Sequence, residues 1–275
     1  MFKSHKYNNN LIDVEEIYGF LERGVTRPLR CRLQDGRIAI VKYMRNPLGQ
    51  RVLINELVGS CIADIIGLSI PSFGICELSN DVIYNSNDEE EIDELNAGPA
   101  FYTEFYSQSV PPNLKSFLSL VINKETERII LFDHIVNNND RHEGNLLLVM
   151  NHTVRMVAID NSNIITDYSN KDFKAELNSS VIESDKLMSQ NRDIYNLLIA
   201  NVGFNENVLR EEARNIQSIV TEGVLRDIRN IIPVEWTNNV DAGYVDCVFS
   251  VIKARVKALV EIEEIVIESR RKLNG

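Results

Sequence analysis

The stretch that decides the fold is IVNNNDRHEGNLLLV, residues 135–149. Apolar runs lie on both sides of it, and between them stand ionisable and amide side chains that include Asp140 and Asn145. Asn and Asp are common turn formers, so one interpretation is a simple turn. Charged side chains at such a break also suit a loop that binds ions or substrate. The next apolar run of the chain distinguishes the two interpretations.

A second apolar run, RMVAID at residues 155–160, ends in Asp160. The runs on either side of Asn151 and His152 predict a hairpin, which would return Asp160 to the side of Asn145. An Asp and an Asn that approach one ion suit Mg²⁺, and a further Asp can hold and deprotonate a hydroxyl group. A turn alone explains Asp140 and Asn145 but leaves Asp160 unexplained.

The first half of the chain predicts short strands and one helix. Residues 24–44 predict two strands around the turn Asp35-Gly36, and Lys42 ends the second strand. Residues 50–68 predict a helix with an apolar stripe, and this helix carries Glu56. A strand Lys paired with a helix Glu is the arrangement that fixes an ammonium group on nucleotide phosphates. Two further strands are predicted over residues 72–79 and 99–106.

From about residue 112 the pattern becomes helical, first over residues 114–136 and then over most of 180–270. Strands followed by helices indicate an α+β fold with two lobes. We place a β-rich N-terminal lobe in residues 1–106 and a helical C-terminal lobe in residues 107–275. The acidic stretch 85–98 is expected to be a surface excursion within the first lobe.

Composition narrows the class of protein. The formal net charge of −11 gives no reason to expect nucleic-acid binding. The four cysteines have no metal-binding spacing and no CxxC pair, which favours a reducing, cytoplasmic setting. The first residues show no apolar signal segment, and no run of 18 apolar residues predicts a membrane span. We expect a cytoplasmic protein without membrane contact.

Together these motifs resemble the HipA-like kinases and, more distantly, the phosphatidylinositol kinases. The resemblance is carried by NNDRHEGNLLL at residues 138–148 and VAIDNS at 157–162, with weaker support from GVTRP, DGRIAIVKY and the stretch at residues 53–75. It implies a protein-kinase-like fold over nearly the whole chain. The chain departs from ordinary protein kinases because it has no GxGxxG, no Ala-Pro-Glu and no Phe-Gly after Asp160.

The resemblance implies that the cofactors are ATP and Mg²⁺, and it assigns a role to each matching residue. Arg141 and His142 would brace the loop. The other implied roles are catalytic base for Asp140, Mg²⁺ ligands for Asn145 and Asp160, phosphate contact for Lys42 oriented by Glu56, a phosphate loop at Gly24 and Thr26, and the adenine-binding hinge at Glu104 and Tyr106.

The function that the resemblance implies is transfer of the γ-phosphoryl group of ATP to a hydroxyl, on Ser or Thr of a protein by family analogy. Two alternatives stay open at this point. The enzyme would act on a small molecule or transfer AMP, or the chain would be a nucleotide-binding, pseudokinase-like regulatory module. The retention of Lys42, Asp140, Asn145 and Asp160 together favours an enzyme.

Overall fold

The computed structural model of the protein describes residues 4–21, 25–85, 95–112, 115–123, 125–165 and 186–274. Its N-terminal part is a closed barrel with strand order β1-β2-β3-β5-β4, in which β1 and β4 pair in parallel and the other pairs are antiparallel. The strands are β1 Tyr7–Phe20, β2 Leu29–Leu33, β3 Ile38–Lys42, β4 Phe73–Leu78 and β5 Gly98–Glu104.

The predicted hairpin is the β2–β3 pair, and its turn contains Gly36 at a φ of +84°, a conformation that glycine adopts without strain. Strand β1 is absent from the sequence prediction. Its sequence includes Asn8, Asn9, Asn10, Asp13, Glu15 and Glu16, and of the strand only Val14 is buried, so no alternation marks it. The barrel interior is filled by apolar side chains from several strands, among them Val14, Leu29, Cys31, Leu33, Val41 and Cys76.

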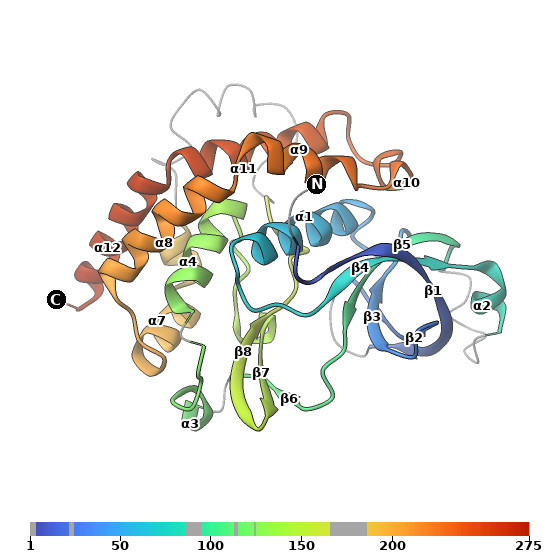
Figure 1. The fold of residues 1–275 in the computed structure, drawn as a ribbon, viewed down its shortest axis with the longest axis horizontal. Coiled ribbons are helices and arrows are strands. Elements are labelled where there is room, and N and C mark those ends of the chain that lie inside the picture. Colours follow the sequence, from blue (N-terminus) through green and yellow to red (C-terminus); the bar gives the residue numbers. More distant parts are fainter. Residues whose placement is uncertain are drawn as a thin grey trace.

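Helix α1 (Arg51–Ile65) lies between the barrel and the helical lobe (Figure 1). The sequence predicted one apolar stripe, but every residue from Val52 to Asp64 is buried. The buried residues include the polar Asn55, Glu56 and Ser60. Polar groups are rarely buried without partners, so this helix is expected to contribute hydrogen bonds to a site.

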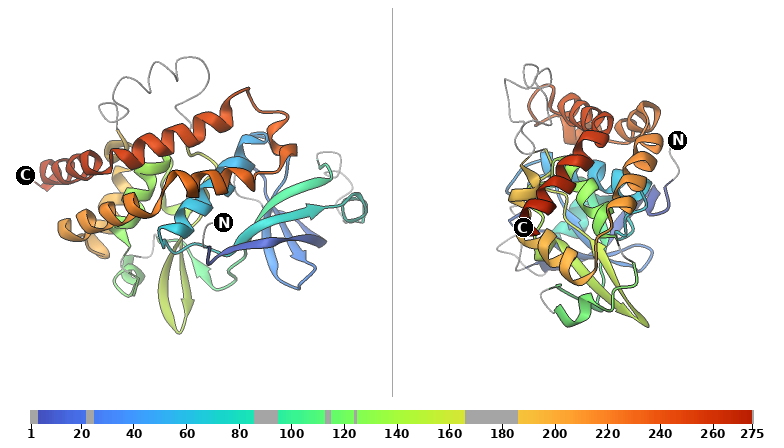
Figure 2. Two further views of the ribbon diagram at one scale, coloured as in Figure 1. Left: turned by 45° about the horizontal axis from the view of Figure 1, so that its top comes forward. Right: turned by 90° about the vertical axis from the view of Figure 1, so that its left-hand side faces the viewer.

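The C-terminal part consists mainly of helices that stack on the side of the molecule away from the barrel (Figures 1 and 2). None of the helices in the described ranges is long and apolar enough to cross a membrane. Helix α2 (Asn80–Tyr84) belongs to the N-terminal part and lies beside β1 (Figure 1). The bounds of the C-terminal helices are α3 Lys115–Leu118, α4 Thr126–Val136, α6 Leu187–Gln190, α7 Arg192–Asn201, α8 Glu206–Ile219, α9 Glu222–Asn230, α10 Val234–Thr237, α11 Tyr244–Lys257 and α12 Leu259–Asn274.

The predicted second hairpin is confirmed as β7 (Leu146–Asn151) and β8 (Thr153–Ala158), with the short β6 (Ser109–Val110) beside β7. The single helix predicted over residues 114–136 is wrong in its middle. There the chain leaves helical geometry, Val121 forms a bridge with Val154, and the Ile122 N–H donates to the Val154 carbonyl at 3.0 Å. Pairing with β8 overrides the local helical pattern.

Trp236 lies on α10 and links the two lobes through a hydrogen bond. Its side chain is fully buried, and its indole Nε1 donates to the carbonyl oxygen of Pro99, at the start of β5, at 2.8 Å. This hydrogen bond connects the C-terminal helices to the barrel.

Trp236→Phe is expected to lower the free energy of unfolding by about 1–3 kcal/mol, because the half-buried Pro99 carbonyl loses its donor and the smaller ring leaves space in the core. Urea unfolding of the two proteins measures the change. Val234→Ala, on the exposed face of the same helix, is the control and should stay within about 0.5 kcal/mol of wild type. An unchanged midpoint for Trp236→Phe would show that the indole hydrogen bond contributes nothing to stability.

Candidate active site

A cleft of about 600 Å³ is lined by residues of the barrel, of α1 and of the loops around the β7–β8 hairpin. Gly24 lies outside the described residues. Every other residue predicted for the site lines this one cleft: Thr26, Lys42, Glu56, Glu104, Tyr106, Asp140, Asn145 and Asp160. The folding of the chain therefore brings together positions that are more than 130 residues apart in the sequence.

Lys42 is buried and stands at the centre of a polar cluster. Its Nζ donates to the Glu56 carboxylate, to Asp160 Oδ1 at 3.0 Å and to Ser162 Oγ at 2.7 Å. Burial alone would lower the pKa of the ammonium group, but the Glu56 and Asp160 carboxylates outweigh it and raise the pKa above its ordinary value. Lys42 is therefore a permanent positive charge within the cleft.

Asp160 follows β8 with its backbone in the left-handed region, at a φ of +59°. Its Oδ1 accepts from Lys42 Nζ and from Ser162 Oγ, the latter at 2.6 Å. Partial removal from water favours the neutral acid, yet Lys42 and Ser162 hold the pKa of Asp160 well below its usual range. The carboxylate is thus ionised at neutral pH.

Asn145 and Asp160 are brought side by side by a backbone hydrogen bond, in which the Ile159 N–H donates to the Asn145 carbonyl at 3.0 Å. The Asn145 amide Nδ2 donates to the Asp140 carbonyl at 2.7 Å. Its Oδ1 is then the atom that can bind a metal ion. One amide oxygen and one carboxylate fit Mg²⁺, whose remaining positions are filled by water and phosphate oxygens. No cluster of three or more His, Cys, Asp or Glu residues suited to a metal exists in the part of the chain that the structure describes.

Asp140 is half-buried at the other end of this group. Its Oδ2 accepts from Asn163 Nδ2 at 2.6 Å, and its backbone N–H donates to Asn138 Oδ1 at 3.1 Å. The first contact orients the carboxylate and the second holds the backbone. Neither partner is charged. Such a group can accept a proton from a hydroxyl that enters the cleft.

Arg141 stabilises the loop that carries Asp140 and Asn145. Its buried guanidinium donates from Nη1 to the carbonyls of Asn145 at 3.0 Å and Ile159 at 3.2 Å, and from Nε and Nη2 to Asp133. The exposed His142 accepts the Gly144 N–H through Nδ1 at 2.9 Å and caps the short 3₁₀ turn Glu143–Asn145. Both residues therefore stabilise the loop conformation.

Asp133 was missed by sequence reasoning. It lies fully buried in α4 and also accepts from Asn138 Nδ2 at 3.0 Å and from Tyr195 Oη at 3.1 Å. The signal in the sequence is an Asp in the middle of the apolar run IILFDHIV, residues 129–136. A buried carboxylate needs a charged partner, and Arg141 is that partner.

The opposite end of the cleft is mainly apolar. Thr26 is a buried residue of the cleft lining, and the strand end at Glu104 is held by its own N–H, which donates to the Ser72 carbonyl at 2.8 Å. Flat apolar walls of this kind suit an aromatic base, with polar groups only at the edge. The walls include Leu21, Ile40, Phe105, Leu147 and Ile159.

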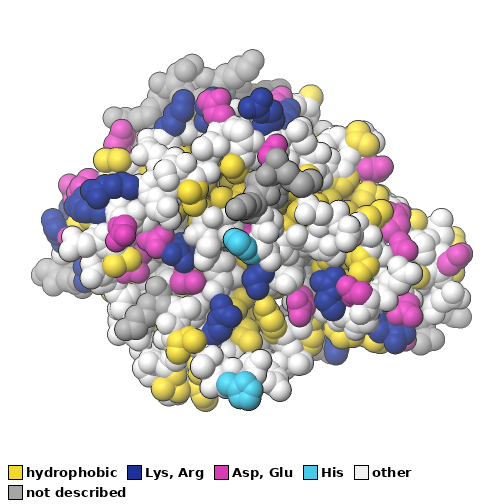
Figure 3. Space-filling view, viewed as in Figure 1, with side chains coloured by type: hydrophobic (Ala, Val, Ile, Leu, Met, Phe, Trp, Pro, Cys, Tyr) yellow, Lys and Arg dark blue, Asp and Glu magenta, His cyan; other side chains and the backbone are white. Residues whose placement is uncertain are grey.

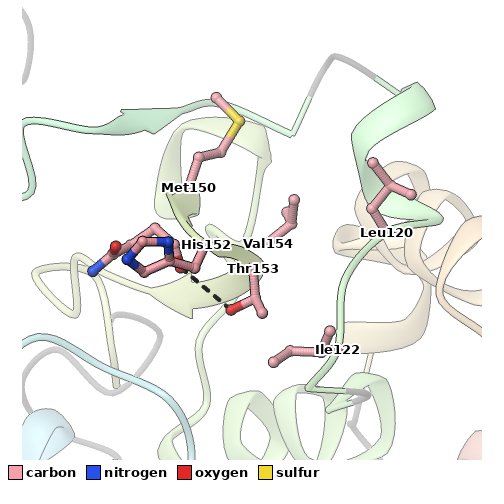
Figure 4. Close-up of a pocket in the computed structure, with 7 residues that line it drawn as sticks. Leu120, Ile122, Met150, His152, Thr153 and Val154 are labelled. Carbon is pink, nitrogen blue, oxygen red and sulfur yellow. Dashed lines mark hydrogen bonds between the residues drawn. The ribbon is translucent and has the colours of Figure 1, made fainter.

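A second hollow of about 490 Å³ lies at the tip of the β7–β8 hairpin (Figure 4). Leu120, Ile122, Met150, His152 and Val154 are among the residues around it, and none of the predicted site residues is. On the face of the molecule shown in Figure 3, Lys and Arg side chains are interspersed with Asp and Glu, and neither sign forms a broad patch. The cleft at Lys42 and Asp140 is therefore the candidate active site.

Comparison with solved structures identifies the fold. The Golgi casein kinase aligns with a TM-score of 0.53 at 10% sequence identity, over 94% of this chain and 74% of that chain. A second structure of that kinase, with Mn/ADP bound, aligns with the same values. At this identity the likeness shows the fold alone, and it confirms the predicted protein-kinase-like architecture with a β-rich first lobe and a helical second lobe.

Comparison with curated protein sequences finds no matching relative. A family model described as HipA-like kinase matches residues 14–261, which is most of the chain. The predicted resemblance is confirmed, and the protein belongs to the HipA-like kinase family.

Proposed function

We propose that the protein is a phosphotransferase that uses ATP and Mg²⁺ and transfers the γ-phosphoryl group to a hydroxyl. The observation that carries this proposal is the meeting of Lys42, Glu56, Asp140, Asn145 and Asp160 in one cleft of a chain that belongs to a kinase family. The related fold of the Golgi casein kinase, whose structure holds Mn/ADP, supports a nucleotide with a divalent metal as the ligand.

In this proposal the adenine lies between the apolar walls and meets the edge of the barrel at Glu104 and Tyr106. Thr26 lies near the phosphates. Lys42 neutralises the α- and β-phosphates, and Glu56 keeps its ammonium in place. Most of the rate enhancement would come from positioning and from neutralised charge, because phosphoryl transfer needs little covalent chemistry from the protein.

Asn145 and Asp160 would hold Mg²⁺, which when bound neutralises charge on the phosphates. Asp140 would orient the attacking hydroxyl and accept its proton. The Asn163 amide keeps the Asp140 carboxylate aimed, since it occupies Oδ2. The other carboxylate oxygen, Oδ1, is then the atom that takes the proton.

The acceptor that we propose is a Ser or Thr hydroxyl of a protein, and the warrant is family analogy. Residues 1–106 are proposed to form the nucleotide-binding lobe and residues 107–275 the catalytic lobe. A hydroxyl on a small molecule would use the same five residues, so the acceptor must be identified by experiment.

The proposal is tested with α-labelled and γ-labelled ATP, incubated with the protein, Mg²⁺ and a cell lysate. We expect label to pass to a product from the γ position only, and to be lost when EDTA removes the metal. The labelled product then identifies the acceptor as a protein band or a small molecule.

Label transferred from the α position would contradict phosphoryl transfer and indicate transfer of AMP. Absence of label with a large rise in melting temperature on addition of MgATP would indicate a nucleotide-binding regulatory module. A ligand present at 100 times its Kd stabilises the folded state by about 2.7 kcal/mol, so binding without catalysis is readily detected.

A further inference from the structure

Ser162 lies at the centre of the charged cluster, two residues after Asp160. Its side chain is buried, and its Oγ is 2.7 Å from Lys42 Nζ, 2.6 Å from Asp160 Oδ1 and 3.0 Å from Glu56 Oε1. Its backbone N–H also donates to Asp160 Oδ1 at 3.1 Å. One hydroxyl thus touches three of the residues to which the proposed function gives a role.

The chemistry of the cluster explains why a hydroxyl suits this position. Glu56 and Asp160 are two carboxylates that share the single ammonium of Lys42, so they repel each other. A hydroxyl has one proton to donate and can accept as well. Ser162 can accept from Lys42 while it donates to a carboxylate, and alanine at this position would leave that carboxylate with one donor fewer.

The backbone of Ser162 is held by helix α1. Asn55 on α1 donates through Nδ2 to the Ser162 carbonyl at 2.8 Å and to the Ile164 carbonyl at 3.1 Å. The Tyr244 hydroxyl on α11 donates to Asn55 Oδ1 at 2.7 Å, which fixes the orientation of that amide. The C-terminal helices therefore act on the cleft through Asn55.

The close approach of α1 to this segment depends on Gly59. A Cβ on Gly59 would lie 2.7 Å from the Cβ of Asn161, a distance that real side chains do not adopt. The Asn161 N–H donates to Glu56 Oε2 at 3.1 Å, and its side chain donates to Ser60 Oγ at 3.3 Å. Helix α1 and residues 160–163 thus pack as one unit.

We infer that Ser162 is a positioning residue that sets the orientation of the Asp160 carboxylate for the metal and keeps Lys42 and Glu56 in register with it. The inference rests on the proposed function, because it concerns the same metal and nucleotide. Oδ1 of Asp160 accepts from Lys42 and Ser162, so Oδ2 would be the oxygen that holds the metal.

Ser162→Ala is expected to weaken the apparent affinity for Mg²⁺ by about 10–100-fold, which is the usual effect of losing a group that orients a metal ligand. The affinity for ADP without metal should fall much less, because Asp160 acts on the nucleotide through the metal. Ser162→Thr keeps the hydroxyl and should restore most of the Mg²⁺ affinity.

The measurement is a calorimetric titration of the full chain with ADP at a series of Mg²⁺ concentrations. Ser60→Ala is the matched control, since Ser60 is also buried, lies on α1 and contacts Asn161, but touches none of the charged groups. A merely structural role for Ser162 would lower ADP binding equally with and without Mg²⁺.

The inference is overturned if Ser162→Ala binds Mg²⁺ within about twofold of wild type, or if Ser60→Ala loses as much affinity. If Ser162→Ala does not fold, Tyr244→Phe is the deciding variant, because it removes only the hydroxyl that orients Asn55. A lower apparent affinity for Mg²⁺ in Tyr244→Phe supports the inference. An unchanged apparent affinity for Mg²⁺ overturns it. Wild-type protein whose ADP binding ignores Mg²⁺ would instead contradict the proposed function itself.

Discussion

Asp140→Ala is expected to slow phosphoryl transfer by about 10²–10⁴-fold, the usual contribution of a positioned general base. Binding of MgATP should stay close to that of wild type. The reason is spatial. The Asp140 carboxylate contacts Asn163, and only its backbone contacts the side chains of Asn138 and Asn145. The phosphate-binding cluster is centred on Lys42 and Asp160.

Single-turnover transfer of γ-label measures the rate, and calorimetry with ADP and Mg²⁺ measures binding. A loss in kcat with an unchanged KM for ATP would mark an interaction made in the transition state only. Asp140→Asn is the informative second variant, because it keeps the size of the side chain but cannot take a proton. If Asp140→Asn transfers label as fast as wild type, Asp140 is not the base.

The loop and the hairpin could be predicted from the sequence because they are local. Asp140 and Asn145 are five residues apart, and the β7–β8 turn alone returns Asp160 to Asn145, so adjacent segments define the group. Lys42 and Glu56 followed from a strand and the next helix. In each case the side chains that meet are placed by neighbouring elements, which hydrophobic period and turn chemistry specify.

The supporting residues could not be predicted in this way because their partners are distant in the sequence. Tyr244 and Asn55 are separated by 189 residues, and nothing in either neighbourhood marks the pair. Ser162 could be recognised only as a hydroxyl near the expected phosphate path, since its three charged partners converge only after α1 packs on the segment 160–163. A polar residue within an otherwise apolar helix is the sequence feature that indicates such a supporting residue.

The prediction of secondary structure was wrong where pairing with other strands determines the conformation. Strand β1 shows no alternation of buried and exposed residues because only one of its side chains is buried, yet its backbone closes the barrel between β2 and β4. Residues 119–123 have a helical pattern, but Val121 and Ile122 contact Val154 of β8 through the backbone instead. In both segments backbone hydrogen bonding to distant strands supplies what the local pattern does not indicate.

The buried Asp133–Arg141 pair should have the largest effect on stability. Arg141→Met is expected to lower the free energy of unfolding by about 3–5 kcal/mol, because it leaves the Asp133 carboxylate buried without a countercharge. Asp133 is fully buried, so water cannot replace the lost partner. Urea unfolding, with the slope compared between variants, gives the change in free energy.

The double variant Asp133→Leu/Arg141→Met separates stability from activity. Removing both charges should recover part of the stability, so the loss will be smaller than the sum of the two single losses. Phosphoryl transfer should not recover, because the carbonyls of Asn145 and Ile159 still lack the donors that Arg141 supplied. Those carbonyls lie beside the residues proposed to hold Mg²⁺. Recovery of activity together with stability would instead show that Arg141 serves only to balance the Asp133 charge, and that the loop holds its shape without it.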